Sequence, residues 1–261
     1  MTAIRLMLFA IVFSSFSPLT KSCELNFNSG PFYSTSYVSS IFQNFFNQVN
    51  KETGCNIIFS TSKNIEEYYS KTLNHEVDFI VAADEAGAAF KVYGFDGLFI
   101  TDPIFSILIV INPSKVTNVS GGYDLTGKSF SSVGNFSLTH TVAEQFFEKK
   151  GVKVSINTVN HLFNGPIEFL KKQHDGVITS DFVYKNFPEA IKNKYTIIHQ
   201  SKKHATSVLV SNKLSPMIIQ SLQRNIHLIK KVPYKKYRTY KIGPHTKKVS
   251  SLLNILAPNV E

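Results

Sequence analysis

The chain has 261 residues, of which 43% are hydrophobic and 18% charged, which is enough apolar material for one large unit or two lobes and excludes a disordered chain. Two cysteines are too few for a disulfide scaffold or a zinc finger. The net charge is +10, but residues 230–261 carry eight Lys or Arg against one Glu, whereas residues 23–229 are nearly neutral. The body therefore lacks the basic stripe expected of a specific nucleic-acid reader.

The first 22 residues have the pattern of a secretory signal. Arg5 precedes an apolar run from Leu6 to Phe13, and small residues occupy positions 20 and 22. The run is shorter than the ~20 residues that a membrane span requires, and no second run of that length follows. We therefore expect cleavage after Ser22 and a soluble, periplasmic protein. Lipoprotein anchoring through Cys23 is the less favoured alternative, because the residues before it fit a lipobox poorly.

Both cysteines lie next to strand-like runs. Cys23 precedes the run 25–28, and Cys55 begins the run 56–59. In an oxidising compartment pairing is the usual outcome, and two neighbouring parallel strands that start at the same end would bring the two thiols together. Such a bridge closes a loop of ~30 residues and contributes roughly 3–4 kcal/mol. The alternative is two unpaired or lipidated thiols.

Short β-rich runs alternate with segments of helical periodicity, which predicts an α/β fold with parallel sheets. In chain order the first series comprises a strand at 25–28, a helix from about 36 that Gly54 ends, a strand at 56–59, a helix at 65–73, a strand at 77–81 and a helix at 86–92. After a Gly121–Gly122 break the second series comprises strands at 129–133, 153–157, 176–179 and 195–199, helices at 139–150, 166–172 and 181–187, then a strand at 207–210 and a helix at 216–229.

Two extended apolar segments, 105–111 and 205–211, would link two lobes. The first lobe is expected to comprise residues 23–110 together with 206–261, and the second lobe residues 111–205. Open α/β sheets bind ligands at the carboxyl ends of their strands, so two such sheets facing each other would enclose a site. Closure about the two crossing segments would be a hinge motion.

Three segments carry a resemblance to a known family. The segment 124–130 reads Asp-Leu-Thr-Gly-Lys-Ser-Phe, 133–135 reads Val-Gly-Asn before a helix, and 175–181 reads Asp-Gly-Val-Ile-Thr-Ser-Asp. In this order, over about residues 24–229, the chain resembles type 2 periplasmic substrate-binding proteins, and most of all the branch that binds phosphate, phosphite or phosphonate for ABC transporters. The resemblance implies two lobes, each a mainly parallel sheet flanked by helices, that grip a small ligand. The branch's Gly-Pro and Tyr after the third strand are replaced here by Ala-Ala-Asp-Glu at 82–85, which leaves the ligand open.

Hydroxyl side chains lie at two predicted helix starts, 34–36 and 137–139. Amides at helix N-termini together with hydroxyls can hold a tetrahedral oxyanion without arginine, although Ser and Thr at these places also serve as N-caps. Asp84 and Glu85 would favour a ligand ammonium and hence a zwitterion, or they cap the helix that follows and complement its dipole. The candidate ligand-binding residues are Tyr33, Ser34, Thr35, Ser36, Asp84, Glu85, Asn135, Ser137, Thr139, His161 and Asp181.

The leading prediction is an exported, monomeric solute receptor that closes over a small anionic or zwitterionic, phosphonate-like ligand and delivers it to an ABC permease. The alternative is ligand-dependent docking onto a membrane sensor, and an exported hydrolase comes third. The motifs of serine hydrolases, zinc proteases and phosphate loops are absent from the sequence, so we expect no catalytic residue, metal or cofactor.

The basic segment from Lys230 onward interleaves lysines with tyrosines. This composition suits anionic lipids, an acidic partner or non-specific contact with nucleic acid. The alternative is an extension that wraps the first lobe and ends in a helix containing Leu252, Leu253 and Leu256.

Overall fold

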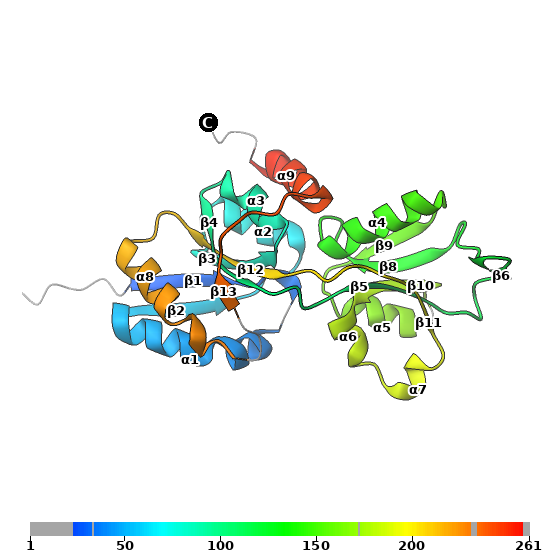
Figure 1. Ribbon diagram of the computed structural model, residues 1–261, viewed down its shortest axis with the longest axis horizontal. Helices are drawn as coiled ribbons and strands as arrows, with labels where there is room; N and C mark the ends of the chain where they lie inside the picture. The colour runs from blue at the N-terminus through cyan, green and yellow to red at the C-terminus, as the bar shows by residue number, and fades with distance from the viewer. Residues whose placement is uncertain (1–22, 33, 172, 231–233, 258–261) are drawn as a thin grey trace, which may run out of the picture.

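The structure is a computed structural model that describes residues 23–257, apart from residues 33, 172 and 231–233. The predicted signal peptide, residues 1–22, lies outside the described residues. Two α/β lobes lie end to end and are joined by two crossing segments (Figure 1). Among the described residues, no helix combines the length and the apolar character that a membrane crossing demands.

A six-stranded sheet forms the first lobe, in the strand order β13-β4-β12-β3-β1-β2. β1 is parallel to β2 and β3, whereas β12 lies antiparallel between β3 and β4. One face packs against α1 and α8, and the other against α2, α3 and α9. The strands are β1 (Cys23–Asn28), β2 (Cys55–Ser60), β3 (Phe79–Ala83), β4 (Phe95–Thr101), β12 (Thr206–Ser211) and β13 (Tyr234–Lys236). The helices are η1 (Gly30–Phe32), α1 (Thr35–Thr53), α2 (Ile65–Leu73), α3 (Ala86–Lys91), α8 (Pro216–Arg224), η2 (Ile226–Leu228) and α9 (Pro244–Leu256).

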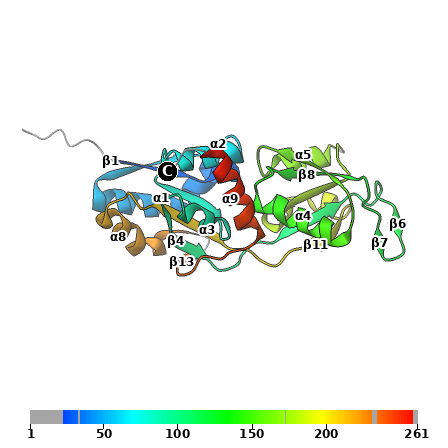
Figure 2. The same ribbon diagram turned by 90° about the horizontal axis from the view of Figure 1, so that it is seen from above.

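A five-stranded sheet forms the second lobe, in the order β11-β5-β10-β8-β9. α4 covers one face and α5 and α6 the other, and a short hairpin, β6–β7, projects from the far end (Figures 1 and 2). The strands are β5 (Ile107–Ile111), β6 (Asn118–Val119), β7 (Gly122–Tyr123), β8 (Ser129–Val133), β9 (Ser155–Val159), β10 (Gly176–Ser180) and β11 (Thr196–Gln200). The helices are α4 (Leu138–Lys150), α5 (Asn164–Leu170), α6 (Asp181–Lys185) and α7 (Glu189–Lys192).

The longest helix, α1, forms where the periodicity predicted it. The Ser34 hydroxyl oxygen accepts a hydrogen bond from the Tyr37 amide, which satisfies one of the amides left open at a helix start. Gly54 ends the helix in the left-handed conformation, at φ 70°, where glycine carries no steric penalty. The apolar stripe expected from the sequence is buried against the sheet, and its members are Val38, Ile41, Phe42, Phe45, Phe46 and Val49.

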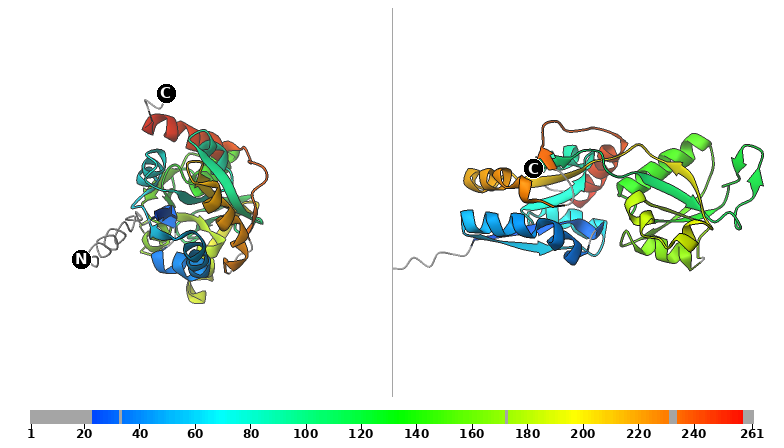
Figure 3. Two further views of the ribbon diagram at one scale, coloured as in Figure 1. Left: turned by 90° about the vertical axis from the view of Figure 1, so that its left-hand side faces the viewer. Right: turned by 60° about the horizontal axis from the view of Figure 1, so that its bottom comes forward.

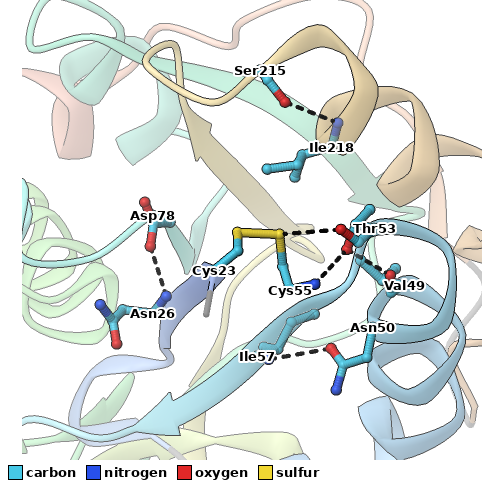
Figure 4. The surroundings of a disulfide bond; sticks show 10 residues. All are labelled: Cys23, Asn26, Val49, Asn50, Thr53, Cys55, Ile57, Asp78, Ser215 and Ile218. Atoms are coloured by element: carbon cyan, nitrogen blue, oxygen red, sulfur yellow. Dashed lines mark hydrogen bonds between the residues drawn. A yellow bond between two sulfur atoms is a disulfide. The ribbon is translucent and has the colours of Figure 1, made fainter. Parts of the chain in front are cut away.

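The disulfide between Cys23 and Cys55 is confirmed. The two residues face each other in the register of the parallel strands β1 and β2, with their Cα atoms 4.3 Å apart, as Figure 4 shows. Thr53 supports this end of the sheet, because its hydroxyl accepts from the Cys55 amide and donates to the Val49 carbonyl. The bridge therefore fastens the edge strand β2 to its neighbour β1.

Several elements differ from the sequence-based expectation. β3 begins at Phe79 instead of 77, and Asp78 just before it holds the Asn26 amide with its carboxylate at 2.7 Å. β4 and β13 were not predicted, because Asp96 and Gly97 interrupt the apolar pattern of β4 and lysines dominate β13. The apolar run 105–111 is mostly β5, a strand inside the second sheet, so the crossing segments are shorter than expected, and the lobe limits stay a prediction.

The crossing segments run side by side, 102–106 and 201–205 (Figure 3). Phe105 and His204 form an antiparallel bridge: the His204 amide donates to the Phe105 carbonyl at 2.7 Å, and the His204 carbonyl accepts from Ile104 at 2.9 Å. Asp181 fastens the first crossing to α6, because its carboxylate accepts from the Ser106 amide and its own amide donates to the Ser106 carbonyl. The two lobes are thus connected by a short, hydrogen-bonded double strand.

Candidate functional site

A cavity of about 580 Å³ lies between the two lobes, next to the first crossing segment, which contributes Ile104 and Phe105 to its wall. Its volume is within the range of small-molecule sites. The described residues that line it include no Asp, Glu, Lys or Arg. They are Phe32, Tyr37, Val38, Ile41, Phe42, Tyr68, Tyr69, Val81, Ala82, Ala83, Ala86, Ile104, Phe105, Ile107, Ser137, Leu138, Thr139, Leu162, Ser180, Phe182, Thr206, Tyr234 and His245.

The second lobe supplies the polar end of the cavity, at the N-terminus of α4. Ser137 caps this helix: its hydroxyl oxygen accepts from the His140 amide at 3.0 Å and donates to the Val133 carbonyl at 2.8 Å. The amides of Leu138 and Thr139 belong to the first turn, where a helix has no internal partner for its N–H groups. The Thr139 hydroxyl makes no hydrogen bond within the part of the chain that the structure describes. Two amides and one hydroxyl are therefore available to an anionic group, with the helix dipole favouring negative charge there.

The first lobe supplies an aromatic wall. The Tyr68 hydroxyl donates to the Val81 carbonyl at 2.8 Å, and the Tyr69 hydroxyl donates across the lobes to the Phe136 carbonyl at 3.3 Å. Burial raises the pKa of both Tyr68 and Tyr69 well above the usual value of a tyrosine hydroxyl. Both tyrosines therefore stay neutral, and with their hydroxyls engaged elsewhere they offer ring atoms to the cavity.

The lobes touch on opposite sides of the cavity. On one side the rings of Tyr37 (α1) and Phe182 (α6) lie 5.7 Å apart between centroids, tilted by 52°. On the other side α9 lies between the first lobe and α4 (Figure 2). There Lys248 forms an ion pair with Glu144 of α4, and His245 Nδ1 lies 3.2 Å from the Thr141 hydroxyl. The structure therefore has the two lobes closed around the cavity.

His245, at the start of α9, is a cavity residue with a defined proton position. Thr141 Oγ1 donates to the Ser137 carbonyl, so it acts as the acceptor toward His245, and Nδ1 carries the proton. The other ring nitrogen, Nε2, makes no hydrogen bond among the described residues. Burial lowers the pKa of His245 to about 3, with Lys248 and His204 adding in the same direction. The imidazole is therefore neutral at pH 7 and leaves a lone pair for a hydrogen-bond donor.

This burial predicts a loss of stability in acid. The unfolded chain binds the His245 proton near pH 6.5, whereas the folded chain resists it down to about pH 3, so stability is fully present above pH 6.5 and falls as the pH drops. We expect His245 alone to contribute a loss of about 2 kcal/mol between pH 7.5 and pH 5. Urea unfolding of His245→Gln should show a shallower dependence on pH over this range. Some dependence should remain, because burial also lowers the pKa of His140, His199 and His204. An unchanged pH dependence in the variant would contradict the assignment.

Asp84 and Glu85 do not line the cavity; they hold the C-terminal segment. Lys241 Nζ lies 3.1 Å from Asp84 Oδ2 and 3.9 Å from Glu85 Oε1, and the Thr246 hydroxyl donates to the Glu85 carbonyl at 2.6 Å. Neither carboxylate caps α3: Glu85 is its N-cap residue without a side-chain cap, and the one backbone amide that donates to the Asp84 carboxylate among the described residues is that of the adjacent Glu85.

The same two acidic residues form, with His204, a group whose ligand atoms lie within 4.8 Å of one another. Two carboxylates and an imidazole could hold a divalent cation. Here the Lys241 ammonium lies beside both carboxylates, where a cation would bind, and offsets part of their negative charge. The arrangement therefore fits a salt-bridge cluster, and we assign no metal to it.

Of the ligand residues predicted from the sequence, Ser137 and Thr139 line the cavity. Tyr33 lies outside the described residues, as does the side chain of Thr35. The structure places the remaining predicted residues away from the cavity wall: Ser34 and Ser36 are exposed at the start of α1, Asn135 and His161 are exposed on the second lobe, and Asp181 fastens the first crossing segment.

Sequence reasoning missed most of the wall. The neighbours of several predicted residues are the ones that face the cavity: Tyr37 follows Ser36, Leu162 follows His161, and Ser180 precedes Asp181. For Ser180 a signal existed, because it caps α6 by accepting from the Val183 amide at 3.2 Å, as a serine before an acidic helix start does. For His245 no local signal existed, because its contact with Thr141 joins residues 104 positions apart.

Comparisons with known proteins agree with the two-lobed architecture. No protein-family model matches the chain, and neither does the sequence of any curated protein. Among solved structures, PhnD1 of Prochlorococcus marinus in complex with methylphosphonate matches with a TM-score of 0.69 and 10% identity, over 90% of this chain and 97% of that one. XAC2383 of Xanthomonas citri bound to ATP matches with a TM-score of 0.64 and 13% identity, over 92% and 100%.

A third structure is the alkanesulfonate-binding protein SsuA of Xanthomonas axonopodis pv. citri bound to MOPS, with a TM-score of 0.57 and 13% identity, over 90% of this chain and 80% of that one. The chain therefore has the fold of type 2 periplasmic binding proteins, with two mixed sheets each flanked by helices. At sequence identities this low, the structural likeness shows the fold and nothing more specific.

Proposed function

We propose that this chain is an exported solute-binding protein that closes over a small ligand with an oxyanion head group, phosphonate-like or sulfonate-like, and presents it to a membrane permease. One observation carries the proposal: the N-terminus of α4 presents two open amides and the Thr139 hydroxyl to the cavity between the lobes. Two of the similar structures, PhnD1 in complex with methylphosphonate and the alkanesulfonate-binding protein SsuA, support a head group of this kind.

Asp84 and Glu85 are not proposed as a subsite for a ligand ammonium. Both carboxylates are buried against Lys241 and lie outside the cavity wall, so their charge is already compensated. We therefore propose an anionic ligand and not a zwitterion bound through these two residues. Among the described residues no hydroxyl or thiol is hydrogen-bonded to His245 Nε2, so the cavity shows no nucleophile paired with a general base, and binding without turnover suits the site.

A screen for ligands tests the function. The chain from Cys23 onward, with its disulfide oxidised, should be melted in the presence of phosphate, methylphosphonate, organic sulfonates, amino acids and neutral sugars. A ligand that binds only the folded state raises the melting temperature by mass action. We expect at least one oxyanion to stabilise the protein, whereas a response confined to sugars or cations would contradict the proposal.

The Thr139 hydroxyl gives a residue-level test. Thr139→Val keeps the shape of the side chain and removes its donor, so we expect the dissociation constant of the best oxyanion to rise roughly tenfold, as for loss of one hydrogen bond to a charged group. Isothermal titration calorimetry measures this. Thr139→Ser, which keeps the hydroxyl, is the matched control and should bind within about twofold of the parent. If Thr139→Val binds the oxyanion as tightly as the parent protein does, the head group does not bind at the Thr139 hydroxyl of α4.

A further inference from the structure

The cavity is larger and more apolar than an anionic head group requires. Its volume of about 580 Å³ corresponds to roughly nineteen water molecules at ~30 Å³ each. A head group with a single methyl substituent would leave most of that volume to water. Water there would lie against aromatic and aliphatic side chains, which offer it few hydrogen bonds.

The polar atoms on the wall are mostly engaged by the protein itself. The hydroxyls of Tyr68 and Tyr69 donate to backbone carbonyls, and the Ser137 hydroxyl both donates and accepts within the cap of α4. The wall groups that can still bond a ligand include the Thr139 hydroxyl beside α4, His245 Nε2 at the start of α9, and the hydroxyls of Ser180 and Thr206. The cavity is therefore amphipathic, with a few polar groups and a wide apolar remainder.

Aromatic side chains from both lobes and from a crossing segment contribute to the apolar part. Phe32 and Tyr37 come from the first lobe, Phe105 from the first crossing segment and Phe182 from the second lobe. Tyr37 and Phe182 already meet at 5.7 Å in a tilted arrangement, the geometry in which aromatic rings attract each other beyond simple burial. A ring that enters between the lobes would find ring faces and edges on several sides.

From this wall we infer that the ligand carries an aromatic body behind its oxyanion head, the body filling the apolar part of the cavity and the head lying against α4. The inference rests on the proposed function for the head group and adds the chemical class of the substituent. An aryl phosphonate or aryl sulfonate is the ligand class that satisfies both ends.

Calorimetric titration with four probes separates the two claims. Phenylphosphonate has head and body, methylphosphonate and inorganic phosphate have the head alone, and benzyl alcohol has the body without an anion. We expect phenylphosphonate to bind at least tenfold tighter than the other three, because burial of a ring adds apolar contact that a methyl group lacks. If methylphosphonate or phosphate binds as tightly, the aromatic body is overturned while the proposed function stands. If benzyl alcohol binds as tightly, the body stands and the oxyanion head is overturned. Failure of all four probes overturns both.

A variant pair places the body in the cavity. Phe182 is 37% exposed and lines the cavity, whereas Phe163 is 42% exposed on the same lobe and lies outside the wall. Phe182→Ala should weaken phenylphosphonate about fivefold more than it weakens methylphosphonate, because the Tyr37–Phe182 contact between the lobes is lost for both ligands and the contact with the ligand ring only for phenylphosphonate. Phe163→Ala should leave both affinities unchanged. Equal affinities of Phe182→Ala and the parent for phenylphosphonate would overturn the placement. Both phenylalanines are partly exposed, so neither variant removes a core side chain, and circular dichroism checks the fold of each.

Discussion

Replacing Lys241 with methionine should destabilise the protein by about 3 kcal/mol, although Lys241 itself belongs to neither a helix nor a strand. Its ammonium lies 3.1 Å from Asp84 Oδ2 and 3.9 Å from Glu85 Oε1, and the side chains of Asp84 and Glu85 are only 5% and 7% exposed, against 41% for Lys241. Breaking a buried ion pair by removing one partner leaves an uncompensated buried charge, which costs more than the pair contributes. The loss should appear as a lower midpoint in urea unfolding, with an unchanged slope.

A second lysine of the same segment provides the control. Lys235 pairs with Asp102 at 2.7 Å, but both side chains are more than half exposed, so Lys235→Met should cost no more than about 1 kcal/mol. The triple variant Asp84→Asn, Glu85→Gln, Lys241→Met removes the charges together and should recover much of the lost stability. If Lys241→Met unfolds at the same urea concentration as the parent, the carboxylates do not depend on this lysine.

Loss of the Cys23–Cys55 bridge should lower the free energy of unfolding by roughly 3.5–4 kcal/mol. The cysteines are 32 positions apart, and closing a loop of that length restricts the unfolded chain by about this amount. The double variant Cys23→Ala, Cys55→Ala is the appropriate change, because Cys55 is buried and alanine introduces no unpaired polar group there. Urea unfolding with and without a reductant measures the effect.

Unfolding in the presence of a reductant separates the stability that the disulfide contributes from the stability that the packing of the two side chains contributes. Reduction should destabilise the parent and leave the double variant unchanged, and the two should then approach the same midpoint. A thiol assay should confirm that the parent protein is fully reduced. If the reduced parent still unfolds at its original urea concentration, the bridge does not make the contribution assigned to it.

The position of the C-terminal segment could not be predicted from its own sequence. Its basic composition suggested a lipid, a partner or nucleic acid as readily as a wrapping extension. In the structure β13 pairs with β4, Leu252 and Leu253 are buried, and α9 lies on α2 and α3 with its first turn against α4. The three leucines predicted a helix, but the surface that covers them lies some 160 positions earlier in the chain.

The candidate site was foreseeable only in part, and for a physical reason. Ser137 and Thr139 could be found because helix starts have their own local requirement for hydroxyl side chains. The aromatic wall could not, because the side chains that meet there come from α1, α2, α6 and the crossing segments, and no periodicity within one element says which other element its face will meet. Asp84 and Glu85 were predicted to bind a ligand because nothing near them in the sequence reveals their partner. That partner, Lys241, lies 157 positions from Asp84 along the chain.

The amino-acid sequence by itself determined the alternation of strands and helices, the Gly54 stop of α1, the division into two α/β lobes and the neighbouring positions of Cys23 and Cys55. These features depend on apolar spacing, backbone conformation and strand order, all of which act within a few tens of residues. The tertiary structure alone decided which buried charges are paired and which side chains enclose the cavity. Those outcomes depend on desolvation and packing between segments that are distant in sequence, where the free energy of each group is set by its neighbours in space.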